Sequence, residues 1–179
     1  MLPLDRRAED SEPGGALWFP REQQGPGRHD NPESYGCLYV SESPVSAIAE
    51  QLAPFRGGGP LLPSMLVRYE LQLALAELEL PDAAEVVDLD DPEVLRNEGL
   101  RPSQVATRQR SATQLQAAEI HAAHAQAAAI RWWSTLESSW INLTLFDRAA
   151  GSVVLGELAP LKVSDPHVVE AADFLGLSR

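Results

Sequence analysis

The sequence contains little cysteine and no long hydrophobic run. Among its 179 residues Cys37 is the one cysteine, so no internal disulfide can form, which fits a reducing compartment. No run approaches the ~20 apolar residues that would cross a bilayer. Residues 1–15 are charged and rich in proline and glycine, without the apolar core of a signal peptide. These features predict a soluble, cytoplasmic protein.

Basic residues are scarce relative to acidic ones. The chain carries 14 Lys and Arg against 26 Asp and Glu, a formal net charge of −12. This balance argues against bulk binding to nucleic acid or to an anionic membrane, but it does not exclude a local basic pocket.

Several common binding motifs are missing as well. No GxGxxG follows a predicted strand, so a Rossmann nucleotide site is not supported. The run Gly57–Gly59 lacks the Lys-Ser/Thr that completes a P-loop, and a flexible hairpin or lid is favoured over a phosphate cradle. His121 and His124 lie three residues apart without a third ligand nearby. We interpret them as a solvated or hydrogen-bonded pair and expect no metal.

The spacing of the predicted elements favours an α+β fold over a doubly wound sheet, because strands and helices of unequal length give no regular βαβ rhythm. The length fits one domain, with 1–15 as a flexible lead-in and 16–179 as the folded part. Strands are predicted at 16–19, 36–40, 65–75, 85–89 and 140–146, and helices at 43–52, 91–99, 103–129 and 165–174.

One stretch, residues 25–50, combines a cation, a phenol and a carboxylate on three kinds of element. Arg28 lies in a Gly/Pro turn, Tyr39 in an apolar strand, and Glu50 on a helix that Ser43 caps and Pro44 opens. We hypothesise that the three side chains converge on one ligand, anionic at one end and cationic at the other. Each also has an ordinary explanation: a surface cation, a core aromatic and a solvated acid.

The order and spacing of these residues resemble the RES domain, a family named after an Arg, a Glu and a Ser. The resemblance covers roughly 16–146. The matching positions are Gly27-Arg28, Asp30-Asn31-Pro32, Tyr39, Glu50, Ser134, Asn142 and Leu145-Phe146-Asp147. Family members often begin with an apolar-aromatic-Arg triplet well upstream. Here the sequence has Leu17-Trp18-Phe19-Pro20-Arg21 instead, so Arg21 is expected to act from a shifted position.

The resemblance implies an ADP-ribosyltransferase-like fold, with a split mixed β-sheet and surrounding helices. It also implies a toxin of a toxin–antitoxin pair, neutralised by an Xre-type antitoxin, that consumes NAD as its substrate. The reaction is hydrolysis or phosphorolysis of NAD, or transfer of ADP-ribose to a protein. The oligomeric state, a homodimer included, stays open.

The proposed roles follow from the chemistry of NAD. Breaking the nicotinamide–ribose bond develops positive charge on the ribose, which the carboxylate of Glu50 would stabilise. Arg28, with Arg21 as a second cation, would bind the phosphates. Tyr39 and Ser134 are predicted to be catalytic residues beside Glu50 and to bind the dinucleotide as well. Tyr39 would lie against the nicotinamide or ribose and offer its hydroxyl, and Ser134 would bind the ribose or hold Glu50.

The acceptor of the ADP-ribose is left open by the sequence. Arginine-modifying ADP-ribosyltransferases typically have an acidic residue two positions before the catalytic Glu, and here that position is Ile48. Water, phosphate and another protein side chain remain as acceptors. A third reading is a non-enzymatic binding module that has kept the fold.

Overall fold

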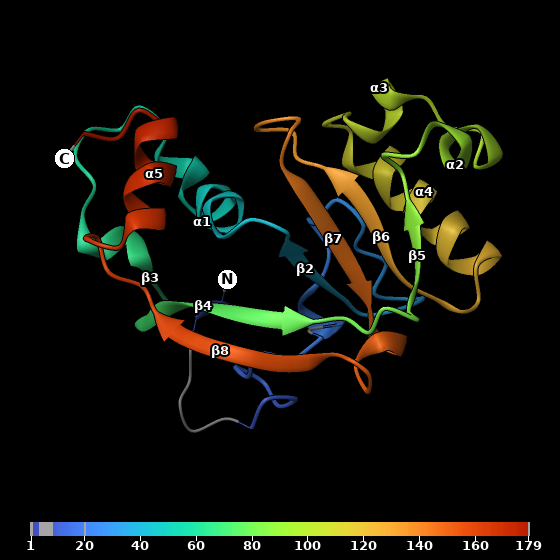
Figure 1. Ribbon diagram of the computed structural model, residues 1–179, viewed down its shortest axis with the longest axis horizontal. Coiled ribbons are helices and arrows are strands. Elements are labelled where there is room, and N and C mark those ends of the chain that lie inside the picture. The colour runs from blue at the N-terminus through green and yellow to red at the C-terminus, as the bar shows by residue number, and fades with distance from the viewer. Residues whose placement is uncertain (1, 4–8, 20, 179) are drawn as a thin grey trace. The chain divides into compact units, whose positions relative to one another are not determined.

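A computed structural model describes residues 2–3, 9–19 and 21–178 (Figure 1). By its internal contacts the described chain divides into two compact units. The first comprises the residues up to 18 together with 41–79 and those from 154 onward. The second comprises 19–40 and 80–153, apart from residue 20. The units are described in turn.

The first unit is built on an antiparallel sheet around the long strand β4. Among the described residues this sheet has four strands, namely β1 (Leu2–Pro3), β3 (Val67–Arg68), β4 (Leu71–Glu79) and β8 (Val154–Pro160), and β4 pairs with each of the others. Leu2 and Pro3, which fall in the predicted lead-in, pair with Ala74 and Leu73. The extent of a flexible lead-in remains a prediction, because 4–8 lie outside the described residues.

Two helices, α1 (Pro44–Leu52) and α5 (Pro166–Phe174), pack against each other in this unit (Figure 1). The start of α1 is as predicted: Ser43 is the N-cap, its side chain accepts a hydrogen bond from the Ser46 amide, and Pro44 follows. Ile48 and Leu52 are fully buried whereas Glu50 is exposed, which confirms the predicted stripe. Short 3-10 turns follow at Ala53–Phe55 and Pro63–Leu66.

The predicted single strand at 65–75 is wrong. The segment forms a hairpin in which β3 turns into β4 through Tyr69 and Glu70. Both turn residues have positive φ, 49° and 65°, the conformation of the hairpin turns usually built from Asn and Gly. Because Tyr69 and Glu70 are not residues typical of such turns, the alternating hydrophobicity predicted one continuous strand.

The second unit holds a mixed sheet with the strand order β2-β7-β6-β5 in the described part of the chain. Its members are β2 (Cys37–Ser41), β5 (Glu85–Asp88), β6 (Ala127–Trp133) and β7 (Ile141–Phe146). β5 and β6 are parallel, whereas β6 and β7 are antiparallel. The predicted α+β class with a split, partly mixed sheet is therefore confirmed.

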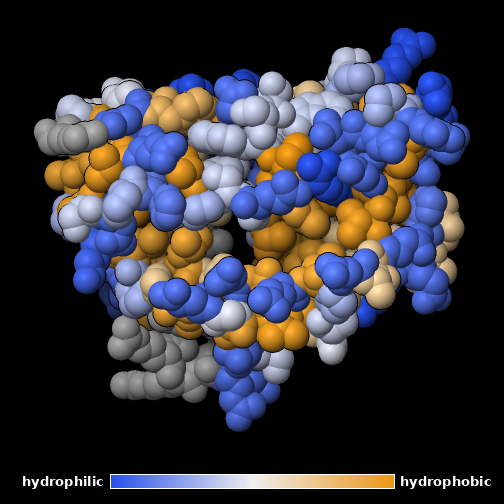
Figure 2. All heavy atoms as spheres, viewed as in Figure 1, coloured by the Kyte–Doolittle hydropathy of each residue, from blue (hydrophilic) through white to orange (hydrophobic). Residues whose placement is uncertain are grey.

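Three helices connect β5 to β6: α2 (Pro92–Asn97), α3 (Pro102–Val105) and α4 (Arg110–Ala123) (Figure 1). Leu95 and Val105 are the buried residues of α2 and α3, and hydrophilic side chains cover the surface over these helices (Figure 2). None of the helices in the described residues is long and apolar enough to cross a membrane.

Three further corrections concern element boundaries. The predicted helix at 103–129 breaks between α3 and α4, and its Ala-rich end, Ala127–Ala129, is instead buried strand between β5 and β7. Burial in the sheet overrides the helix propensity of alanine. No strand forms at the described residues 16–19, where Leu17 closes a turn onto Asp10. Strand β8 was not predicted.

The core of the second unit gathers the sheet and the helices around Phe146. Phe146 is fully buried and meets the rings of Tyr35 and His121 edge-on, with centroids 4.9 and 4.8 Å apart. Val87, Ile120 and Ile130 belong to the same cluster. Edge-to-face aromatic contacts stabilise the fold beyond the burial of apolar surface, so removing the Phe146 ring should lower the stability of the fold substantially.

Replacing Phe146 by Ala should lower the free energy of unfolding by about 3–5 kcal/mol, because it leaves a cavity beside two aromatic rings. Urea unfolding monitored by circular dichroism measures the loss. The exposed Leu115 offers a control, since Leu115→Ala should change stability by less than about 0.5 kcal/mol. Equal effects of the two substitutions would contradict the assigned core.

Candidate functional site

The turn at 25–31 is organised by the carboxylate of Asp30, which is 6% exposed. Its Oδ2 accepts hydrogen bonds from the amides of Gly25 (2.8 Å) and Gly27 (2.7 Å). Its Oδ1 accepts from the Tyr39 hydroxyl at 2.6 Å and from the Cys37 thiol at 3.6 Å. Burial raises the pKa of Asp30, but these hydrogen bonds outweigh it and the pKa lies below the ordinary value.

Gly27 is required by the closeness of this carboxylate. A Cβ at position 27 would lie 2.3 Å from Asp30 Oδ1, which no unrelaxed structure permits. At Gly25, whose amide binds the same carboxylate, a Cβ would meet nothing within 4 Å. The glycine of the Gly27-Arg28 pair is therefore explained by contact with Asp30.

Tyr39 has an enclosed hydroxyl and an exposed ring. The hydroxyl donates to Asp30 and accepts a hydrogen bond from the His29 amide at 2.8 Å. The residue as a whole is nevertheless 36% exposed. Burial of the hydroxyl, with Cys37 and Asp30 nearby, raises the pKa of Tyr39 far above its ordinary value. At neutral pH the phenol is protonated and held at both its donor and an acceptor position.

His29 is a buried, neutral imidazole. Its Nδ1 lies 2.8 Å from Thr144 Oγ1 on β7, and the same oxygen accepts from Trp132 Nε1 at 3.1 Å. The rings of His29 and Trp132 meet edge-on at 5.3 Å. Burial, reinforced by the charge of Arg28, lowers the pKa of His29 to about 3. Trp132 of β6 and Thr144 of β7 thus contact residues of the turn at 25–31.

Arg28, expected to bind the phosphates, is only 4% exposed. Its Nη1 donates to the carbonyls of Val105 (2.8 Å) and Thr107 (2.9 Å), and its guanidinium carbon lies 4.9 Å from the centre of the Trp132 ring. Its own carbonyl accepts from Thr113 Oγ1 at 2.6 Å. The side chain therefore fastens the connection between α3 and α4 to the sheet, a contact that local sequence does not reveal.

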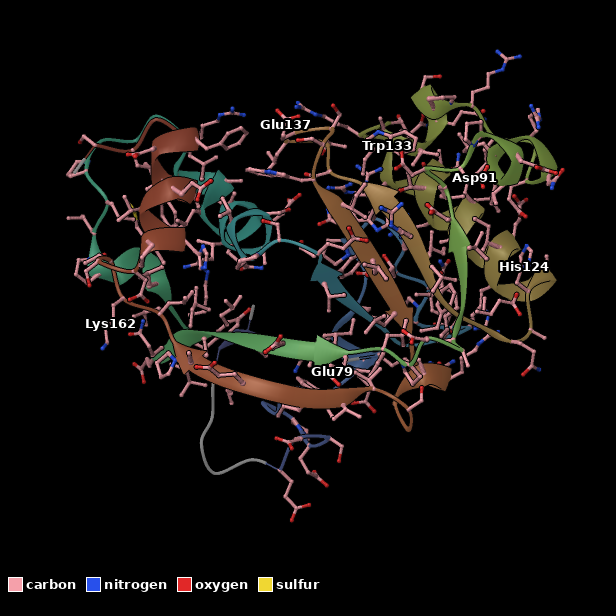
Figure 3. All side chains as sticks on the ribbon, viewed as in Figure 1. Glu79, Asp91, His124, Trp133, Glu137 and Lys162 are labelled. Atoms are coloured by element: carbon pink, nitrogen blue, oxygen red, sulfur yellow. The ribbon has the colours of Figure 1, made fainter. Side chains whose placement is uncertain are left out.

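Ser134 directly follows β6 and is 2% exposed. Its amide donates to the Trp140 carbonyl at 2.7 Å, and its Oγ accepts from the Leu136 amide at 3.0 Å. Asn142, buried as well, pairs with Trp132 across the strands. Figure 3 labels Trp133 at the end of β6 and Glu137 in the connection to β7 that Ser134 begins.

Glu50 and Arg21 are exposed. Glu50 lies on α1 of the first unit, one residue after the buried Ala49. Arg21, in a short 3-10 turn of the second unit, donates to the carbonyls of Pro32 (2.5 Å) and Glu33 (2.8 Å). Arg21 thus binds the backbone at Pro32 and Glu33, directly after the turn that carries Arg28.

The structure links two of the predicted residues, Arg28 and Tyr39, through other side chains. Arg28 connects to Tyr39 through Trp132, Thr144 and His29. Ser134 lies two residues beyond Trp132. Asp30 belongs to the matched Asp30-Asn31-Pro32 motif, but no role of its own was predicted for it. Thr144 and His29 had no such signal, because they bond to each other across 115 positions of the sequence.

His121 and His124 have separate environments. His121 lies against the rings of Tyr35 and Phe146, and burial, together with the charge of Arg148, lowers its pKa. His124, at the end of α4 (Figure 3), bonds to Glu98 at 2.8 Å through Nε2. Among the residues that the structure describes, no group of three His, Cys, Asp or Glu side chains is placed to hold a metal ion.

The glycine run is tied to the end of the chain within the first unit. The Gly57 amide donates to the Leu175 carbonyl at 3.1 Å, and the Ser178 amide donates to the Gly59 carbonyl at 2.9 Å. Gly57 and Gly59 adopt positive φ, 68° and 99°, which explains glycine at these two positions. Backbone hydrogen bonds on both sides hold this loop in place.

Comparison with known proteins supports the resemblance drawn from the motifs. The family model of the RES domain matches residues 4–164. A search of the curated proteins finds no match. A chain of the crystal structure of the M. tuberculosis MbcT–MbcA toxin–antitoxin complex has a similar fold, with a TM-score of 0.60 and 16% identity. The alignment covers 84% of this chain and 76% of that one.

Replacing Gly27 by Ala should lower the free energy of unfolding by about 1–3 kcal/mol, since the new methyl group displaces the Asp30 carboxylate. Gly25→Ala is the matched control and should leave stability unchanged or raise it by up to about 1 kcal/mol. Thermal and urea unfolding of the two variants measure the difference. Equal stabilities would show that the carboxylate does not occupy this position.

The buried His29 should make stability depend on pH. Because its folded pKa is depressed, the unfolded chain binds a proton that the folded chain refuses between about pH 6.5 and 3. Stability should therefore fall with decreasing pH by about 1.4 kcal/mol per pH unit below pH 6. Urea unfolding at pH 7, 6 and 5 should show this slope in the wild type and a shallower one in His29→Asn. Parallel slopes would mean that His29 titrates normally.

Proposed function

The chain belongs to the RES domain family, and from this premise we propose that it is a toxin that consumes NAD. The proposed reaction breaks the bond between nicotinamide and ribose, with water or phosphate as the acceptor. The observation that carries the proposal is the match of the family model over 161 of 179 residues (164 − 4 + 1). The similar fold of a chain from a toxin–antitoxin complex supports the role of a toxin.

Glu50 is the proposed catalytic carboxylate. The nicotinamide leaves as a neutral molecule, so the departing group needs no acid, and the charge to be stabilised is positive charge on the ribose. A fixed carboxylate supplies that stabilisation. The helix that carries Glu50 is fixed by the fully buried Ile48, Ala49 and Leu52, while the carboxylate itself is exposed. The buried face of α1 thus fixes the backbone position from which the carboxylate projects.

Arg28 and Arg21 are the proposed cations for the pyrophosphate. The guanidinium of Arg21 is exposed and lies on the turn that follows Asn31. Arg28 is buried beneath the carbonyls of Val105 and Thr107. Contact of Arg28 Nη1 with a phosphate therefore requires the 105–107 segment to release these hydrogen bonds. A phosphate would replace these neutral acceptors by an anionic one, which can accept two parallel hydrogen bonds from a guanidinium.

Tyr39 and Ser134 are the proposed contacts of the nicotinamide ribose and its base. The exposed ring of Tyr39 offers a flat apolar surface to such a group. Ser134 is buried, and its Oγ accepts a hydrogen bond from the Leu136 amide, which holds the oxygen in place. These residues bind and orient, and the proposed step needs no proton from them.

Transfer of ADP-ribose to a protein is the second candidate, because it breaks the same bond. One observation restricts it. Ile48, which occupies the place of the second acid of arginine-modifying enzymes, is fully buried in the core. An acid cannot stand there without losing that packing, so arginine is disfavoured as the acceptor.

An antitoxin is the proposed protein partner. The support is the solved complex, whose chain with a similar fold comes from a toxin–antitoxin assembly. We propose an Xre-type antitoxin, in line with the family resemblance. The net charge of −12 suits a toxin that leaves contact with DNA to its partner.

Glu50→Gln should reduce NAD turnover by at least ~10²–10³, because it removes the charge that stabilises the transition state while keeping the shape of the side chain. The assay incubates the purified chain with NAD labelled in the adenine, with and without phosphate and cell lysate. Free ADP-ribose, or its 1-phosphate, identifies the products, and label retained on a protein band identifies transfer.

Glu170→Gln on α5, an exposed acid of the same unit, is the matched control and should keep full turnover. Expression of the wild type should slow bacterial growth, whereas Glu50→Gln should not. Full turnover by Glu50→Gln would remove this residue from the mechanism. Intact NAD after long incubation with folded wild type would favour the binding-module reading instead.

A further inference from the structure

The two ends of the Tyr39 side chain have opposite environments. The hydroxyl is enclosed between Asp30 Oδ1, which accepts its proton at 2.6 Å, and the His29 amide, which donates to it at 2.8 Å. The residue as a whole is 36% exposed, and because the hydroxyl is enclosed this exposure falls on the rest of the residue. A side chain that served only the core would bury its ring and leave the polar tip near water. Tyr39 does the reverse.

The carboxylate of Asp30 is also held by hydrogen bonds other than the one from Tyr39. Its other oxygen accepts from the amides of Gly25 and Gly27. The carbonyls of these two glycines accept in turn from the side chain of Gln114 on α4, at 2.8 and 2.9 Å. The carboxylate that receives the phenol is thus fixed by backbone on one side and by a helix behind it.

We propose that Asp30 is a positioning residue, whose carboxylate clamps the Tyr39 hydroxyl and so presents the ring in one orientation to the base or ribose of the dinucleotide. It follows that the hydroxyl serves as the anchor of the ring and takes no part in proton transfer. This inference rests on the proposed function, since it assigns a role in binding the proposed substrate. It departs from the expectation that Tyr39 offers its hydroxyl to the ligand.

The hydrogen bonds explain why the hydroxyl is excluded from chemistry. Its one proton is committed to a carboxylate that is ionised at neutral pH, because hydrogen bonds keep the pKa of Asp30 low. The raised pKa of Tyr39 removes the phenolate as a base. What remains for the ligand is the ring face. Fixing that ring in advance saves the ordering cost of one side chain, worth about threefold to tenfold in affinity.

A double-mutant cycle with NAD as the probe tests the clamp. Tyr39→Phe keeps the ring and removes the anchor, and Asp30→Asn keeps the shape and removes the charge. Each should raise KM for NAD about threefold to tenfold and lower kcat by less than about threefold. The double variant should have the KM of a single one, since both act through the same contact. A kcat loss of ~10² in Tyr39→Phe, or KM effects that multiply, would overturn the proposal.

A second measurement reads the contact without NAD. In protein with 13C-labelled tyrosine, the ζ-carbon signal missing from Tyr39→Phe identifies Tyr39. That signal should be constant up to pH 11 and should move in Asp30→Asn, whereas the signal of Tyr69, which is 89% exposed, should not move in Asp30→Asn. A Tyr39 signal indifferent to Asp30→Asn would refute the clamp whatever the enzyme does.

The two readouts keep this inference apart from the proposed function. A wild type that leaves NAD intact but shows the dependence of Tyr39 on Asp30 would reject NAD consumption and retain the clamp. Turnover of NAD with independent effects of the two residues would do the opposite. If Asp30→Asn does not fold, the division of the Tyr39→Phe effect between kcat and KM decides alone.

Discussion

A buried carboxylate needs hydrogen bonds as strong as those it loses to water, and Asp30 obtains them from neutral donors. Two glycine amides, a phenol and a thiol converge on it from residues 25–39. Satisfying this one ion fixes the turn, requires a glycine at 27 and sets the position of the Tyr39 hydroxyl on β2. The motif from Gly27 to Asp30 therefore encodes a turn that is built around the carboxylate of Asp30.

Three consecutive buried residues give this turn its character. Arg28, His29 and Asp30 carry a cation, a neutral imidazole and an anion, each less than a tenth exposed. Each of the three side chains has its own hydrogen-bond partners. Arg28 donates to the carbonyls of Val105 and Thr107, His29 bonds to Thr144, and Asp30 accepts from two glycine amides and from Tyr39. The cation beside His29 helps to keep it uncharged. Such a polar interior rigidifies the segment, because every group depends on its partner to offset desolvation.

Elements with strong local signals could be predicted, and those without them could not. The Ser43-Pro44 cap defined α1, and the apolar run around Leu38 defined β2. The hairpin at Tyr69-Glu70 escaped detection, because its residues hold a glycine-like conformation through the pairing of the flanking strands. Ala127–Ala129 resembled helix, and only their place between β5 and β7 makes them strand. In both cases pairing with distant chain outweighed intrinsic preference.

By itself the sequence determined the α+β class, the exposed face of α1 with Glu50, and the spacing that identified the RES domain. Those properties follow from neighbours a few positions apart. Only the tertiary structure decided that Arg28 is buried beside Trp132, that the Tyr39 hydroxyl belongs to Asp30, and that His29 is neutral. Arg28 meets Val105 across 77 positions and His29 meets Thr144 across 115. The charge, burial and availability of a side chain depend on such partners, and no local pattern encodes them.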